Sequence, residues 1–130
     1  MTHLGWAWLA LCVALAIHVA DEALTDFLSV YNPAVRAIRA RLPFLPLPTF
    51  TFPVWLAGLV AVTAFLTSLT PAAFRAAPGM RPTADVFGVV MAGNGLLHLG
   101  ASLYKRRVMP GTYSAPLILA AAIYLLASVP

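Results

Sequence analysis

The sequence predicts an all-α fold, a four-helix integral membrane bundle that forms one transmembrane domain over residues 1–130. Of the 130 residues, 62% are hydrophobic and only 9% are charged, whereas a soluble domain typically carries about 25% charged residues. A membrane-spanning helix needs about 20 residues, so a chain of this length can form about four spans with their loops. The single cysteine excludes a disulfide framework and a thiolate metal cluster.

Four apolar runs are the candidate spans, and we expect them at about residues 4–29, 54–69, 84–104 and 114–129. The Asn-Pro pair that follows the first run favours the end of one helix and the start of another. A Pro-Gly pair between the third and fourth runs is typical of a tight turn.

The segment between the first two spans is expected to lie at the membrane surface. Residues 33–42, PAVRAIRARL, predict a short interfacial helix, amphipathic in pattern, whose arginines contact anionic lipid headgroups or, alternatively, receive an anionic substrate headgroup. Residues 42–53, LPFLPLPTFTFP, contain four prolines and therefore cannot be helical. We expect this Pro-rich loop to cover the mouth of the bundle.

The basic residues predict the orientation of the chain in the cell membrane. Six of the eight Lys and Arg residues fall in the first and third loops. The positive-inside rule therefore predicts a multi-pass protein with these loops in the cytoplasm and both termini outside. We attribute the net charge of +4 to basic residues that set the orientation of the chain and contact membrane lipid, and not to nucleic-acid binding.

Ionisable side chains interrupt the first span at one level. His18, Asp21 and Glu22 are three and four residues apart, so they lie on one side of a helix. A carboxylate at membrane depth costs about 2.5–3.5 kcal/mol on insertion scales, so two of them need a strong compensating interaction. The sequence therefore predicts a functional partner for these side chains inside the bundle.

The third span offers that partner. Asn94, His98 and Ser102 follow one another at intervals of four residues and form a single polar stripe. The first and third spans run in the same direction, and His18 and His98 lie similarly far from the starts of their spans. We therefore expect the two stripes to meet at one depth, in the cytoplasmic half of the bilayer.

These motifs resemble those of the HXXEE-domain integral membrane proteins. The stretch HVADE at residues 18–22 resembles the signature of that family, with Asp21 in place of its first glutamate. The stretch NGLLHLGASLYKRRVMPGTYSAPLIL at residues 94–119 resembles its second block. The resemblance implies that the chain binds a metal through these residues, and it implies no settled activity. Aspartate keeps an oxygen ligand at position 21 but shortens its reach.

Our main hypothesis is a metal-dependent membrane enzyme that takes a hydrophobic or amphiphilic small molecule from the cytoplasmic leaflet. His18, Asp21, Glu22 and His98 would hold one or two divalent ions, either zinc, iron or manganese. Glu22 or Asp21 would move the proton. Asn94 and Ser102 would orient the ring of His98 or a bound carboxylate. The pattern does not distinguish a hydrolase from an oxidoreductase.

Other interpretations of the same residues stay open. Glu22 and His98 are also suited to metal-free acid–base catalysis, as in a membrane isomerase or cyclase. The stripes are also compatible with a non-enzymatic ion or proton relay, with haem ligation, or with polar pairs that only hold helices together. Asp26 either joins the site or pairs with an arginine of the interfacial helix. The sequence leaves open whether a homodimer completes the site.

Overall fold

The computed structural model describes residues 2–129, and all regular secondary structure in this range is helical. The all-α prediction is therefore confirmed for the described residues. In chain order the helices are α1 (Thr2–Leu24), α2 (Leu28–Arg41), α3 (Phe52–Ser68), α4 (Thr70–Phe74), α5 (Met80–Lys105) and α6 (Ala115–Ser128).

Three helical segments are long and apolar enough to cross a membrane, namely His3–Leu24, Phe52–Phe74 and Met80–Lys105. Helix α6 is apolar but has only 14 residues. At 1.5 Å per residue it is about 21 Å long, which is shorter than a hydrocarbon core of about 30 Å. The structure therefore supports a membrane protein with three candidate spanning helices.

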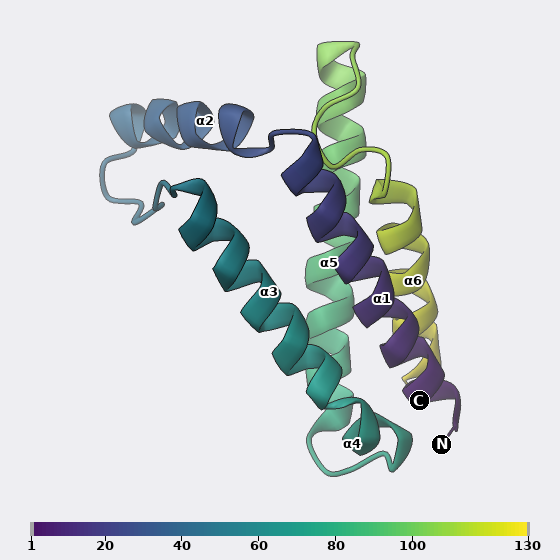
Figure 1. Cartoon of the computed structure of the whole chain (residues 1–130). Helices are drawn as coiled ribbons and strands as arrows, with labels where there is room; N and C mark the ends of the chain where they lie inside the picture. The colour runs from purple at the N-terminus through teal and green to yellow at the C-terminus, as the bar shows by residue number, and fades with distance from the viewer. Residues whose placement is uncertain (1, 130) are drawn as a thin grey trace.

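Helix α6 packs against both α1 and α5, while α3 contacts α1 and diverges from α5 toward the α2 end of the molecule (Figure 1). Two glycines of α5 allow α6 to approach closely. A Cβ atom at Gly95 would lie 3.1 Å from the carbonyl oxygen of Ala115, and one at Gly88 would lie 2.7 Å from Leu126 Cγ. Small residues at such contacts are typical of helix packing in membranes.

The core lies along α1. Trp8 and Leu11 are fully buried, as are Ile118 and Leu125 of α6. The indole nitrogen of Trp8 also donates a hydrogen bond to the carbonyl oxygen of Leu66 at 3.0 Å, which ties α3 to α1. This core fixes the relative positions of α1 and α6, and α5 packs against α6. The helices that bear the two polar stripes are thereby held in place.

The turn between α1 and α2 comes earlier than the apolar pattern indicates. Helix α1 ends at Leu24 instead of continuing to position 29, and Asp26 adopts a left-handed backbone conformation with φ of 57°. Helix α2 then begins at Leu28 and includes Pro33, so the expected interfacial helix is longer than residues 33–42. It crosses the end of the bundle at a steep angle to α1 (Figure 1).

The Pro-rich segment after α2 is non-helical at residues 42–51 and is tied back to α2. The prediction that residues 42–53 are all non-helical is wrong for Phe52 and Pro53, which begin α3, because proline is tolerated in the first turn of a helix. The side-chain amide of Asn32 donates to the carbonyl oxygen of Phe50 at 2.8 Å, and its oxygen accepts from the Phe50 N–H at 3.0 Å. The hydroxyl of Tyr31 donates to the carbonyl oxygen of Pro48 at 3.1 Å. Asn32 therefore holds this segment and does not cap a helix.

The two ends of the molecule differ in charge. Both chain ends lie at one end, whereas α2 and the last turn of α5 lie at the other (Figure 1). Six exposed basic residues belong to the second end: Arg36, Arg39, Arg41, Lys105, Arg106 and Arg107.

Candidate metal centre

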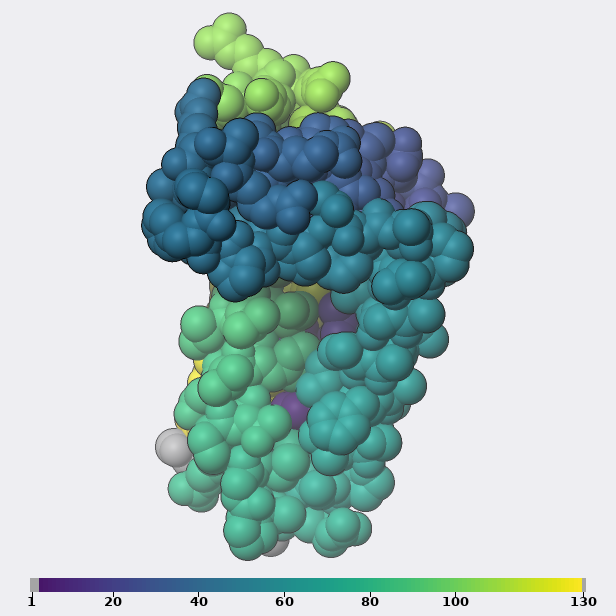
Figure 2. Space-filling model, turned by 90° about the vertical axis from the view of Figure 1, so that its left-hand side faces the viewer, coloured from purple at the N-terminus to yellow at the C-terminus, as the bar shows by residue number. Residues whose placement is uncertain are grey.

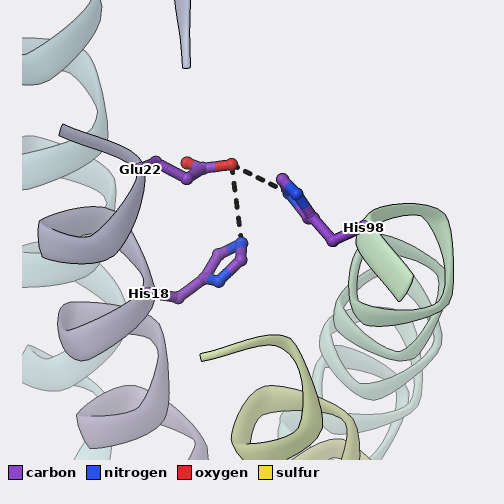
Figure 3. Close-up of side chains that lie close together, drawn as sticks. All are labelled: His18, Glu22 and His98. Atoms are coloured by element: carbon purple, nitrogen blue, oxygen red, sulfur yellow. Dashed lines mark ion pairs between the residues drawn. The ribbon is translucent and has the colours of Figure 1, made fainter. Parts of the chain in front are cut away.

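Three side chains from the two polar stripes meet between α1 and α5. His18 and Glu22 are one turn apart on α1, and His98 projects toward them from α5 (Figure 3). The Oε1 atom of Glu22 lies 3.5 Å from His18 Nε2 and 3.0 Å from His98 Nε2. Their candidate ligand atoms all lie within 4.8 Å of one another. His18, Glu22 and His98 are 1%, 5% and 8% exposed, so the group is closed to bulk solvent.

The ring of His98 is oriented by the loop between α5 and α6. Its Nδ1 lies 2.8 Å from the carbonyl oxygen of Pro110. A carbonyl oxygen can only accept, so Nδ1 must carry the hydrogen. In the neutral ring, Nε2 therefore presents its lone pair toward Glu22.

The ring of His18 is oriented by Ser114 and Asp21. His18 Nδ1 lies 2.7 Å from Ser114 Oγ, and that hydroxyl lies 2.6 Å from Asp21 Oδ2. An ionised carboxylate can only accept, so the serine hydroxyl donates to Asp21 and accepts from His18 Nδ1. His18 Nε2 is thus left with a lone pair, and this buried atom has no hydrogen-bond partner among the described residues.

When both rings are neutral, three acceptor atoms therefore converge without a donor between them: Nε2 of His18, Nε2 of His98 and Oε1 of Glu22. Buried lone pairs that face one another are unfavourable unless a cation stands between them. A metal ion or an added proton can supply that charge. Histidines that bind metals usually donate their other ring N–H to a carbonyl or a carboxylate, as the Nδ1 atoms do here through Pro110 and through Ser114. The surroundings thus fit metal ligation.

Asp21 lies outside the group of three. Its Oδ2 accepts hydrogen bonds from the N–H of Ser114 at 2.8 Å and from the hydroxyl of Ser114 at 2.6 Å. Asp21 therefore acts on the site through Ser114 and His18. Asp26 is exposed and forms no ion pair among residues 2–129, so it contributes nothing to the cluster there.

Asn94 and Ser102 make no hydrogen bond to the ring of His98 within the described chain. Ser102 Oγ lies 2.6 Å from Thr112 Oγ1 and accepts from the N–H of Met109 at 3.0 Å. It thereby shapes the loop that carries Pro110. The side-chain oxygen of Asn94 is buried and has no hydrogen-bond partner among residues 2–129.

Sequence reasoning missed Pro110, Gly111 and Ser114. A backbone carbonyl leaves no pattern in the sequence, and Ser114 is separated from His18 by 96 positions. The N–H of Gly111 also donates to the Thr25 hydroxyl at 3.2 Å, which fastens the loop to the turn after α1. The one sequence signal that could have pointed to this loop was the Pro-Gly turn at residues 110–111, which follows the polar stripe of α5.

Comparison with known families supports the resemblance noted in the sequence. Residues 8–125 match a family model described as a protein of unknown function with an HXXEE motif. The match includes His18, Glu22 and His98. No curated protein matches the chain, and no solved structure does.

Proposed function

The chain belongs to the family of proteins of unknown function with an HXXEE motif, and from this membership and the site geometry we propose that it is a metal-dependent membrane enzyme. His18, Glu22 and His98 would hold a divalent ion, and the substrate would be hydrophobic or amphiphilic. The observation that carries the proposal is the convergence of three buried candidate ligand atoms within 4.8 Å of one another, of which His18 Nε2 has no hydrogen-bond partner among the described residues.

The donor set agrees with zinc, iron or manganese, because two imidazoles and one carboxylate suit all three metals. Such an ion would supply Lewis-acid polarisation or an activated water. One ion is favoured over two, since the group contains three ligand residues and Asp21 is bound to Ser114. Cys12 and the other ionisable residues form no second such group among the residues described.

The side chains of the protein have distinct tasks in this proposal. The backbone carbonyl of Pro110 holds the ring of His98, and the Asp21–Ser114 pair holds the ring of His18. Each Nε2 atom thereby faces the centre of the site. Glu22 is the carboxylate at the centre and is placed to accept or return a proton. The low exposure of all three residues excludes bulk water from the reaction.

A metal-free site is the second candidate function, and one contact favours it. Glu22 Oε1 and His98 Nε2 are 3.0 Å apart, which is hydrogen-bonding distance for a carboxylate and an imidazolium. This pair could exchange a proton with a substrate without any ion.

Elemental analysis of the detergent-purified protein separates the two functions. We expect about one zinc, iron or manganese ion per chain, retained through gel filtration, because three buried ligands bind far more tightly than surface carboxylates. A protein that is folded and contains no stoichiometric metal after growth in metal-supplemented medium would contradict the metal proposal and favour the acid–base pair.

We also propose that α6 crosses the membrane as a fourth helix, with the turn at residues 109–114 extending its length. It packs against both α1 and α5, and the two chain ends lie at the same end of the molecule (Figure 1). An even number of crossings is consistent with that arrangement.

The charge difference between the two ends supports both termini lying outside the cytoplasm. Six basic residues belong to the α2 end, so the positive-inside rule places that end in the cytoplasm. A reporter that is active only outside, fused after Pro130, should therefore be active, and one active only in the cytoplasm should be silent. The reverse result would contradict this orientation and the assignment of the metal centre to the inner leaflet.

A further inference from the structure

A cavity of about 360 Å³ lies directly beside the candidate metal centre. It is bounded by the turn between α1 and α2, by α5 and by the loop after α5. Its walls include Phe27, Tyr31, Asn94, His98 and Pro110. The ring centroids of Phe27 and His98 are 5.7 Å apart. A molecule in this cavity would therefore touch one of the proposed ligands of the metal.

A second hollow of about 570 Å³ runs between the diverging helices α3 and α5. Figure 2 shows this hollow between the two helices, with α1 behind it and α2 with the Pro-rich segment above it. Its walls are almost entirely apolar and include Leu59 and Val62 of α3, with Val90 and Met91 of α5. Such a surface is suited to a hydrocarbon chain.

The two hollows occupy successive turns of α5. Val90 and Met91 line the apolar hollow, and Asn94, which lines the cavity, follows them by four and three residues. Residues at these spacings are neighbours on one face of a helix. A molecule with one end at His98 can therefore extend along α5 into the apolar hollow.

Asn94 is a polar residue in the wall of the cavity, at the end of the two hollows that lies beside His98. Its side-chain oxygen is buried and accepts no hydrogen bond from the described residues. Buried amide oxygens are nearly always paired, so an unpaired one on a side chain that lines the cavity indicates a donor that a ligand brings. No Lys, Arg, Asp or Glu lines either hollow, which favours a neutral head.

We propose that these hollows together bind a single-chain amphiphile with a neutral head that donates a hydrogen bond, such as a long-chain alcohol or amide. The head donates to Asn94 beside His98, and the chain lies between α3 and α5. A single chain is inferred because one apolar hollow occupies the turn of α5 directly before the cavity. The groove between α1 and α3, lined by Ala16 and Thr67, includes neither Asn94 nor His98. The binding of the amphiphile as a substrate rests on the proposed enzyme function.

Photolabelling tests the proposal on the full chain in lipid nanodiscs. The probe is hexadecanol with a diazirine in its chain, and labelled peptides are mapped by mass spectrometry. We expect saturable labelling of α3 and α5 that unlabelled hexadecanol competes away. Its methyl ether has the same chain but no donor, so it should compete about tenfold less well. Equal competition by the methyl ether would overturn the proposal, because the hollow would then hold any lipid chain.

Two variants sharpen the test. Asn94→Leu keeps the side-chain size and removes the acceptor, so saturable labelling should fall about tenfold. Thr67→Val is the matched control, since it removes a polar group from the groove between α1 and α3 and should leave labelling unchanged. Labelling of Asn94→Leu at the level of the unchanged protein would overturn the assignment of Asn94.

His18→Ala separates this inference from the metal proposal, because His18 lines neither hollow. This variant should lose metal and keep competitive labelling. Donor-selective labelling in a protein that never contains metal would remove the metal proposal and leave the amphiphile site. Bound metal with unselective labelling would remove the amphiphile site alone.

Discussion

Alanine at His18, Glu22 or His98 is expected to reduce bound metal from about one ion per chain to background. The three ligand atoms lie within 4.8 Å of one another and come from buried side chains. Removing one leaves two ligands and a cavity, whereas protein sites that retain zinc have at least three ligands. Metal content per chain after gel filtration, together with the elution volume as a measure of folding, checks the expectation.

Two further variants calibrate this series. Cys12→Ala alters a buried core residue that lies outside the group of three, so it should retain its metal. Asp21→Asn keeps an acceptor for Ser114 but loses the charge, and outer partners of this kind typically change affinity by about 10–100-fold. If Asp21→Asn removes the metal as completely as His98→Ala, then Asp21 is a ligand and the assignment through Ser114 is wrong.

The different placement of Asp21 and Glu22 follows from helix geometry. Successive residues are rotated by about 100°, so Asp21 and Glu22 lie on opposite sides of the direction of His18. Glu22 turns toward His98 on α5, and Asp21 turns toward Ser114 at the start of α6. The spacing predicted that all three residues share one side of α1. The spacing could not show that α5 contacts one part of that side, at Glu22, and that the start of α6 contacts the other, at Asp21.

The sequence did predict the level at which α1 and α5 meet. Composition indicated a membrane protein, and similar distances from the helix starts placed His18 and His98 at one depth. The structure brings the two rings to a centroid separation of 4.7 Å. Depth along parallel helices is a local property of each sequence segment, so it was accessible without knowledge of the packing.

The ends of the helices were less predictable. No proline or glycine marks residues 25–27, where α1 ends and Asp26 adopts a positive φ. The turn there is held by contacts with a distant loop, such as the hydrogen bond from the Gly111 N–H to Thr25. Contacts across 86 positions leave no local pattern. The site is therefore completed by the loop after α5, which the apolar periodicity does not describe.

Gly111→Ala is expected to be the most damaging change outside the ligands. Gly111 has φ of 81°, and an added Cβ atom would lie 2.5 Å from His98 Cε1, 2.7 Å from His98 Nδ1 and 3.1 Å from Glu22 Cγ. The ring of His98 or the loop must therefore move, and the hydrogen bond from His98 Nδ1 to Pro110 is lost with either movement. Displacements of about 1 Å at a preorganised site can cost about 100-fold.

Gly79→Ala is the matched control for this substitution. Gly79 has φ of 85°, nearly the same as Gly111, but an added Cβ atom there meets nothing within 4 Å. Both variants carry the strain of a left-handed alanine, which is about 1–2 kcal/mol. We expect both to melt at lower temperature, while Gly111→Ala alone loses metal affinity, by about 100-fold or more. Equal metal affinity in the two variants would show that the loop can shift without disturbing His98, and it would contradict the role given to Pro110 as the group that fixes the ring.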